Sequence, residues 1–190
     1  MIIIGITGTL GAGKGTIVEY LTKKKGFEHY SVRAFLIEEI KKRNLAVNRD
    51  SMVSVANDLR ARHSPGYIVE QLFERAAKSG KNCIIESIRT SGEAEALKSK
   101  GNFYLFAVDA PASLRYERVQ HRNSETDNVS IETFLENEKR EMQSTDPNKQ
   151  NISKCIEMAD YLFENDSTIG KLQDKVNAVI SHILKINKEE

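Results

Sequence analysis

A glycine-rich segment near the start of the chain carries the residue types that bind phosphate. Residues 8–16 read Gly-Thr-Leu-Gly-Ala-Gly-Lys-Gly-Thr, between an apolar β-branched run at 1–6 and apolar residues at helical spacing in 17–21. Strand, glycine loop and helix in this order favour a phosphate-binding loop, because glycines let backbone N–H groups turn inward. The helix dipole and a mobile lysine charge add to the attraction. The predicted triphosphate contacts are Gly8, Gly11, Ala12, Gly13, Lys14, Gly15 and Thr16. The alternative is a glycine-rich turn with a surface lysine.

The loop departs from the general phosphate-loop pattern at one position. That pattern places Ser or Thr directly after the lysine, where this chain has Gly15, and the hydroxyl follows as Thr16. The arrangement G-x-x-G-x-G-K-G-T resembles the loop of adenylate kinase and its nucleoside monophosphate kinase relatives. We expect Thr16 to contact phosphate, with contact to Mg²⁺ as the alternative.

A second chemical group follows the run 82–86, which reads as a buried strand and ends in Glu86. Ligands of open α/β sheets bind beyond the carboxyl ends of strands, so Glu86 is placed to hold Mg²⁺ through its water shell. Arg89, three residues later, is suited to bind a phosphate with two parallel hydrogen bonds. Alternatively, Glu86 caps the next helix and Arg89 pairs with a surface carboxylate. The stretch resembles the Asp-Gly-Phe-Pro-Arg segment of adenylate kinase, without the proline and with Glu for Asp.

Three arginines at spacings of three and four, Arg115, Arg118 and Arg122, form a basic stripe on one predicted helix face. The helix follows a predicted strand at 102–109, so the stripe points toward the phosphate loop. The alternative is that these arginines form an ordinary solvent-exposed face of the helix with no role in phosphate binding. Nucleoside monophosphate kinases carry lid arginines at the corresponding place, and this resemblance implies a short lid at 122–130. It also implies catalytic roles for Lys14, Arg118 and Arg122, with Arg118 also contacting ATP.

The acceptor side of the resemblance covers residues 31–79, where we expect acceptor-binding helices. Adenylate kinases carry Ser-Thr-Gly-Asp-x-x-Arg there, and this chain keeps the serine but has Ile37 in place of the arginine. The expected acceptor contacts are Ser31, Arg33, Arg60 and Arg89. Residues 159–166 resemble the region that borders the adenine in these families and in dephospho-CoA-kinase-like proteins, which implies an ATP contact for Asn165.

Strands and helices alternate along the chain and must position these groups. Apolar runs at 1–6, 27–30, 82–86, 102–109 and 161–163 predict five strands. Helical spacing of apolar residues separates them and closes the chain after Ile169. The pattern predicts a parallel sheet with helices on both faces. With the glycine loop it predicts an α/β P-loop NTPase fold in a single domain, residues 1–190, which includes the acceptor-binding helices and the lid.

Composition excludes several classes of partner. The 190 residues carry a net charge of +1 with 29% charged residues, so no overall field favours nucleic acid or a membrane. Both cysteines, Cys83 and Cys155, lie in core-like sequence and are expected to be free thiols of a reducing compartment. The N-terminus reads as a strand and not as a signal peptide, so we expect a cytoplasmic protein. A monomer or small homo-oligomer is expected.

The candidate site residues are mainly lysine and arginine, and none of them is an evident nucleophile. This combination is typical of phosphoryl transfer, in which catalysis depends on positioning and electrostatic stabilisation. The resemblance implies transfer of the γ-phosphate of ATP, with Mg²⁺, to a nucleoside monophosphate or related nucleotide. One alternative is dephospho-CoA-kinase-like transfer to a ribose hydroxyl, which needs a general base. That family usually has Gly-Lys-Ser in its loop and an early Asp, which this chain lacks. A second alternative is a regulator that binds ATP or AMP without turnover.

Overall fold

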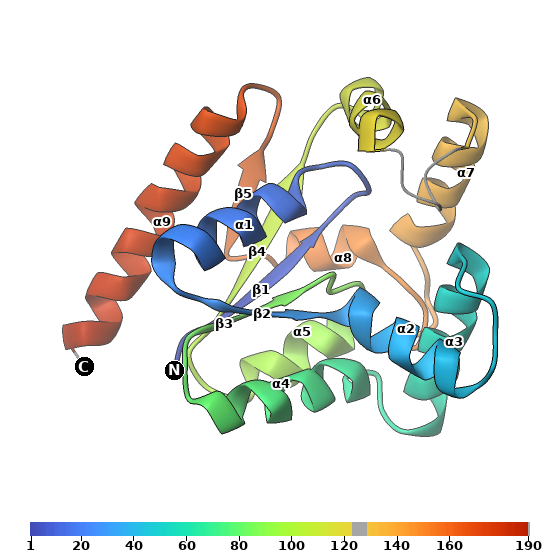
Figure 1. The fold of residues 1–190 in the computed structure, drawn as a ribbon, viewed down its shortest axis with the longest axis horizontal. Coiled ribbons are helices and arrows are strands. Elements are labelled where there is room, and N and C mark those ends of the chain that lie inside the picture. The colour runs from blue at the N-terminus through green and yellow to red at the C-terminus, as the bar shows by residue number, and fades with distance from the viewer. Residues whose placement is uncertain (123–128, 190) are drawn as a thin grey trace.

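A parallel sheet of five strands, in the order β2-β3-β1-β4-β5, forms the centre of the molecule (Figure 1). The structure is a computed structural model and describes residues 1–122 and 129–189. The strands are β1 Ile3–Gly8, β2 Glu28–Ser31, β3 Cys83–Glu86, β4 Phe103–Asp109 and β5 Tyr161–Glu164. All five lie within two residues of the apolar runs that predicted them, and the predicted parallel sheet is confirmed.

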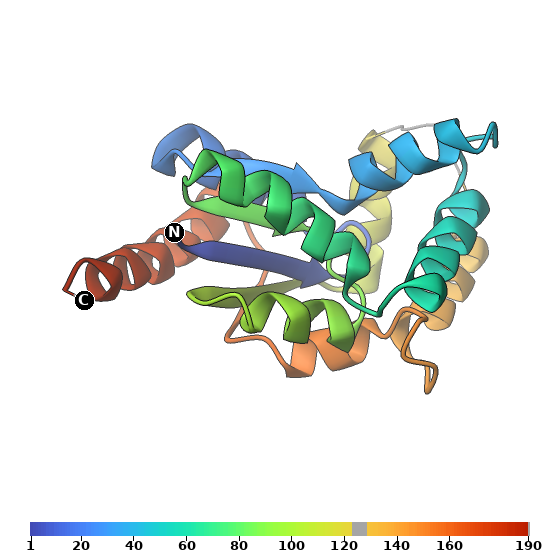
Figure 2. The ribbon, with the colours of Figure 1, turned by 90° about the horizontal axis from the view of Figure 1, so that it is seen from below.

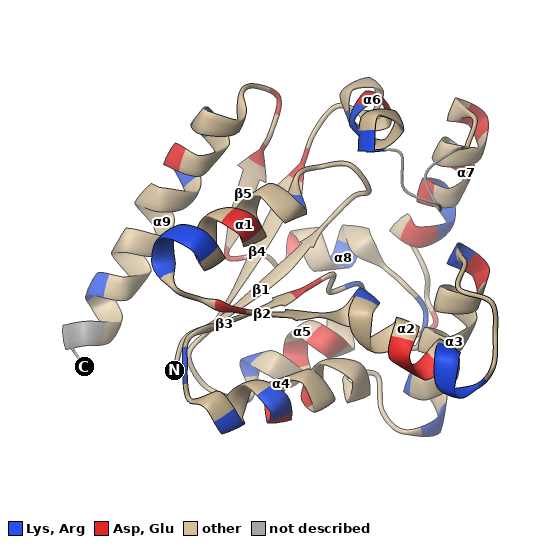
Figure 3. Ribbon diagram, in the orientation of Figure 1, with Lys and Arg blue, Asp and Glu red and all other residues tan. Residues whose placement is uncertain are grey.

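Helices cover both faces of this sheet (Figures 1 and 2). In chain order they are α1 Lys14–Lys25, α2 Val32–Lys42, α3 Arg49–Arg62, α4 Tyr67–Ser79, α5 Ser91–Lys98, α6 Ala112–Arg122, α7 Ile131–Met142, α8 Ile152–Glu157 and α9 Ile169–Glu189. None of the described helices is both long enough and apolar enough to cross a membrane. Acidic and basic residues are interspersed along α4, α7 and α9, as the near-zero net charge leads one to expect (Figure 3).

Strand alternation divides the core into two layers. Ile4 and its neighbours Ile84 and Phe106 pack against α1 and α9 on one face. Ile3 and Ile85 point to the other face, where α4, α5 and α8 cover them. Every residue of β1 is buried. A strand covered on both faces favours apolar residues, and β1 consists of three isoleucines, two glycines and Thr7, whose buried hydroxyl donates to the carbonyl of Ile88 at 2.8 Å.

The carboxyl ends of β1, β3 and β4 meet at one edge of the sheet, because neighbouring parallel strands end together. Ile6 is in register with both Glu86 and Phe106. Helices α2, α3 and α7 stand beyond this edge and do not cover the sheet itself (Figure 1). The edge and these helices enclose the space in which the chemically suited side chains lie.

A buried ion pair ties α3 to α5 beside that space. The Arg60 and Glu93 side chains are 1% and 0% exposed, and Arg60 Nη2 donates to Glu93 Oε1 at 2.8 Å. The other carboxylate oxygen of Glu93 accepts the backbone N–H groups of Arg89 at 2.8 Å and Thr90 at 3.3 Å. Glu93 therefore fixes the backbone of Arg89 as well as the position of α3.

Replacing Glu93 by Ala should destabilise the fold strongly, because it leaves a buried guanidinium and two N–H groups unpaired. Breaking a buried pair from one side costs about 3–5 kcal/mol of unfolding free energy. Urea denaturation measures the loss, and Glu95→Ala, an exposed change on the same helix, is the control. A loss as small as that of the control would contradict the structural role given to Glu93.

Candidate functional site

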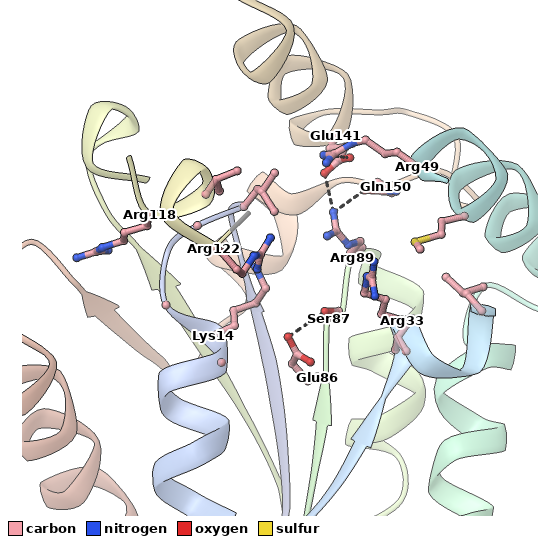
Figure 4. A pocket seen from close by; sticks show the side chains of 18 of the residues that line it. Lys14, Arg33, Arg49, Glu86, Ser87, Arg89, Arg118, Arg122, Glu141 and Gln150 are labelled. Atoms are coloured by element: carbon pink, nitrogen blue, oxygen red, sulfur yellow. Dashed lines mark hydrogen bonds and ion pairs between the residues drawn. The ribbon is translucent and has the colours of Figure 1, made fainter. Parts of the chain in front are cut away.

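A cleft of about 670 Å³ opens where the carboxyl ends of the strands face α2, α3 and α7. Figure 4 shows Lys14 and Arg122 pointing into it from one side and Arg89 from another. Glu86 and Ser87 lie between them, below the guanidinium of Arg89. The cleft thus brings together the glycine loop and the end of β3, which are about seventy residues apart in the sequence.

The glycines of the loop are required by its backbone. Gly11 and Gly13 have φ values of 80° and 115°, a region that residues with a Cβ rarely adopt. A Cβ on Gly11 would lie 2.4 Å from the carbonyl oxygen of Arg115. A Cβ on Gly13 would lie 2.3 Å from the amide nitrogen of Asn165. The loop is therefore held close to α6 and to the segment after β5.

Side chains from distant segments hold the loop in this shape. The Asn165 amide donates to the carbonyl of Ala12 at 2.8 Å, and the Thr9 hydroxyl donates to Asp109 at 2.6 Å. The guanidinium of Arg115 donates to the carbonyl of Leu10 at 3.3 Å. The loop is consequently preorganised before any phosphate binds.

Lys14 folds back over its own loop. Its Nζ donates to the carbonyls of Gly8 and Thr9, both at 2.8 Å. Burial, and then the nearby positive charge of Arg89, lower the pKa of Lys14 to about 7. A bound triphosphate would stabilise the charged form, since an opposite charge raises the pKa of an amine.

Glu86 supplies the carboxylate of the cleft floor. Its Oε2 lies 3.3 Å from His29 Nε2, and its Oε1 accepts the Ser87 hydroxyl at 3.2 Å. Burial alone would raise the pKa of Glu86, but hydrogen bonding to His29 and the charge of Lys14 outweigh it and the pKa is lowered. Ser87 has a φ of 74°, so the turn after β3 adopts a conformation that favours glycine.

The oxygen donors of this floor fit a magnesium ion. Glu86 and Thr16 line the same cleft as Lys14, and Mg²⁺ prefers carboxylate, hydroxyl and water oxygens. Because Glu86 stays ionised, it matches a hydrated cation. The sequence predicted Glu86 as a metal-binding residue and Thr16 as a phosphate contact with Mg²⁺ as the alternative, and both residues line this one cleft.

The far end of the cleft is formed by arginines and an apolar wall. Arg89 Nη1 donates to Glu141 at 2.6 Å and to Gln150 at 3.0 Å, and Arg49 Nη2 donates to Glu141 at 2.5 Å. The apolar wall comes from α2 and α3, as Val32, Leu36, Met52, Val53 and Ala56. This end of the cleft therefore combines guanidinium groups with an apolar surface.

The structure separates the three arginines that the sequence placed on one face. Arg115 is buried and pairs with Glu138 below the loop, so it braces the loop and does not reach the cleft. Arg118 donates to the carbonyl of Asn165 at 2.9 Å, and its guanidinium points away from the centre of the cleft (Figure 4). Arg122 points toward Lys14 (Figure 4). Their helix packs against the loop, which places the three side chains in different surroundings.

Three of the residues predicted to contact the acceptor have different roles in the structure. Ser31 caps α2, its hydroxyl accepting the N–H of Ala34 at 3.2 Å. Arg33 lines the cleft from the same helix, as expected. Arg60 also borders the cleft, but its buried pairing with Glu93 makes it a structural group more than a free phosphate ligand.

No pattern in the sequence predicted that Arg49, Glu141 and Gln150 belong to the site. Arg49 follows Asn48, whose side chain accepts the N–H of Ser51, so a helix-start signal was present next to it. Nothing local distinguishes Glu141 from the other charges of α7. Most of the predicted lid at 122–130 lies outside the described residues.

Comparison with known proteins shows the family of the chain. A family model described as an AAA domain matches residues 4–146. A UPF0200 protein of Methanococcus vannielii is 30% identical over 188 residues, covering 97% of each chain. The chain belongs to both families.

Solved structures similar to this UPF0200 chain have the same fold. TT1252 from Thermus thermophilus aligns with a TM-score of 0.62 and 20% identity, covering 95% of this chain and 97% of that one. Dephospho-CoA kinase from Campylobacter jejuni aligns with a TM-score of 0.57 and 16% identity, covering 97% and 98%. These likenesses show the fold, and the predicted α/β P-loop NTPase fold is confirmed.

Binding of ATP should take up a proton at pH 8, because the pKa of Lys14 in the free cleft is about 7 and a triphosphate raises it. Calorimetry in two buffers of different ionisation enthalpy measures the uptake, expected to approach about one proton at pH 8 and to fall toward pH 6. Lys14→Arg, which stays protonated, should abolish the uptake. Equal uptake in that variant would assign the proton to another group.

Proposed function

We propose that this protein is a Mg²⁺-dependent kinase that transfers the γ-phosphoryl group of ATP to the phosphate of a nucleoside monophosphate or related nucleotide. The observation that carries the proposal is that three cationic side chains face one another across a single cleft. Lys14 and Arg122 point into it from the glycine loop and α6, while Arg89 faces them from the β3 side (Figure 4).

The donor half of the cleft is suited to a triphosphate. Backbone N–H groups of the glycine loop and the N-terminus of α1 provide fixed dipoles for phosphate oxygens. Lys14 and Arg122 add charge where the transferred group becomes electron-rich. Asn165 and Ile169 border the loop on the side where a nucleoside would extend. Mg²⁺ near Glu86 and Thr16 would neutralise phosphate charge when bound.

The acceptor half is suited to a phosphate monoester attached to an apolar or aromatic body. Arg33, Arg49 and Arg89 supply guanidinium groups, which bind phosphate in bidentate geometry. The wall from α2 and α3 provides the apolar surface against which a base stacks. Catalysis then consists of holding the acceptor oxygen in line with the γ-phosphate, with water excluded.

Transfer to a ribose hydroxyl, the alternative, needs a free general base. The carboxylates among the described residues of the cleft wall are Glu86 and Glu141. Glu86 is bound by His29 and Ser87, and Glu141 is paired with two arginines. Burial alone would raise the pKa of each carboxyl, but these partners outweigh burial and lower it. Both carboxylates are therefore weak bases. This observation favours a phosphate acceptor.

A coupled assay of ADP release tests the proposal directly. Purified protein is supplied with ATP, Mg²⁺ and each member of a panel of ribo- and deoxynucleoside monophosphates and dephospho-CoA. We expect rapid ADP release with one or a few monophosphates, and loss of at least about a hundredfold in Lys14→Ala, comparable to removing a preorganised charge contact. ADP release only with dephospho-CoA would favour the alternative. Tight ATP binding without any turnover would favour a regulator.

Arg89→Ala should raise the acceptor KM and leave ATP binding without acceptor nearly unchanged. A charge-assisted hydrogen bond is worth about 1.5–3 kcal/mol, which corresponds to a KM increase of roughly tenfold to a hundredfold. Steady-state kinetics with saturating ATP measure it, with Arg62→Ala, an exposed position outside the cleft, as control. A fall in ATP affinity alone would place Arg89 on the donor.

A further inference from the structure

The carboxylate of Glu141 lies between two arginines of the acceptor half. One oxygen accepts from Arg49 Nη2 at 2.5 Å and the other from Arg89 Nη1 at 2.6 Å. The Glu141 side chain is 6% exposed and projects from α7, while its partners come from α3 and the loop after β3. Bridging two guanidinium groups is what a phosphate group does in an arginine-lined site.

The two arginines are not saturated by this carboxylate. Arg49 Nε is buried and lacks a hydrogen-bond partner among the described residues, although Nε and Nη2 together form the fork that binds an oxyanion through two bonds. Arg89 uses Nη1 for both Glu141 and Gln150, and its guanidinium extends over Glu86 and Ser87 toward the cleft (Figure 4). An anion with more oxygens would satisfy these donors better than Glu141 does.

Glu141 is ionised in this position. Burial would raise its pKa, but the charges of Arg89 and Arg49 outweigh burial and lower it. The carboxylate therefore neutralises two guanidinium groups that would otherwise repel one another and lack a counterion. An incoming anion can release Glu141 without leaving those charges unpaired.

We propose that Glu141 is an internal occupant of the acceptor-phosphate site, that the acceptor's phosphate displaces it from Arg49 and Arg89, and that this exchange selects for phosphate over carboxylate. The proposal rests on the proposed function for the identity of the acceptor. It assigns Glu141 a role in specificity and no contact with the reacting atoms.

The selection follows from comparing the two anions. A carboxylate ligand offers one negative charge and two oxygens, the same as Glu141, which has the advantage of being attached to the protein. A phosphate monoester offers nearly two charges and three oxygens, enough to use the fork of Arg49 and the remaining donors of Arg89. A carboxylate acceptor therefore forms no more hydrogen bonds than Glu141 already does, whereas a phosphate acceptor forms additional ones. Displacement would also free the C-terminal turn of α7, which Glu141 ties to α3.

Calorimetric titration of the whole protein with inorganic phosphate and with acetate, in the absence of nucleotide, tests the proposal. In Glu141→Gln the competing charge is lost while the shape is kept. We expect phosphate to bind roughly tenfold to a hundredfold tighter than in the unmodified protein, the range of one charge-assisted hydrogen bond. Acetate should not bind measurably to the unmodified protein but should bind to Glu141→Gln. Glu136→Gln removes one charge from an exposed position of the same helix and should change neither affinity.

The site of the gain is checked by adding Arg49→Gln to Glu141→Gln, which should abolish it, since phosphate at the glycine loop does not depend on Arg49. Glu141→Asp keeps the charge but has a shorter side chain, so it should increase phosphate affinity by less than Glu141→Gln does. This variant replaces Glu141→Gln in the test if that protein does not fold. Weaker or unchanged phosphate binding in Glu141→Gln or Glu141→Asp would overturn the proposal and make Glu141 a support for the arginines. Because ATP is absent, either result is independent of whether the protein turns over.

Discussion

Repulsion among cations that share one cleft is the constraint on which the rest of the site depends. The chain carries a net charge of only +1, yet one cleft collects Lys14, Arg33, Arg49, Arg89 and Arg122. The cost is visible in Lys14, whose pKa falls to about 7 through burial and the neighbouring arginine charges. Glu86 on the cleft floor and Glu141 in the acceptor half offset part of this repulsion. A cleft of this kind has its strongest affinity for ligands with several negative charges.

The parallel sheet makes such a concentration of charge possible. Its central strands β1, β3 and β4 are mostly apolar inside the sheet, so charged groups gather where these strands end, at one edge. Asp109 and Asn165, at the ends of β4 and β5, are used to hold the glycine loop. Arg115 holds it from α6. A rigid loop presents its N–H groups without reorganisation when phosphate binds, which is the condition for strong electrostatic stabilisation.

Features that are determined by residues close together in the sequence could be predicted, whereas features that depend on tertiary packing could not. The strands, the glycine loop and the helix that Ser31 caps follow from neighbouring residues, and the structure contains them. Lys14 was predicted from the glycine-loop pattern, Glu86 from its place at the end of a strand, and Arg89 from its position three residues later. Spacing also placed Arg115, Arg118 and Arg122 on one face, but packing of α6 against the loop buries the first and turns the second toward Asn165.

Long-range pairings account for the residues that the sequence did not reveal. Glu141 is 92 residues from Arg49 and 52 from Arg89, so no local pattern marks it as part of the acceptor half. Arg60 resembled a phosphate ligand because its partner Glu93, 33 residues away, is recognisable only in the folded chain. Buried charges are placed by the partners that tertiary structure supplies, and pattern analysis does not locate those partners.

We propose that donor and acceptor phosphates meet in one cleft between Lys14 and Arg89. Calorimetric binding of a bisubstrate analogue, adenosine joined through a polyphosphate chain to the acceptor nucleoside found by the ADP-release assay, tests it most directly. The account predicts that the analogue binds at least about tenfold tighter than ATP, since linking two ligands makes the second contact intramolecular. It also predicts that Lys14→Ala and Arg89→Ala each remove much of that affinity. An analogue that binds no tighter than ATP, with affinity insensitive to Arg89, would contradict the account.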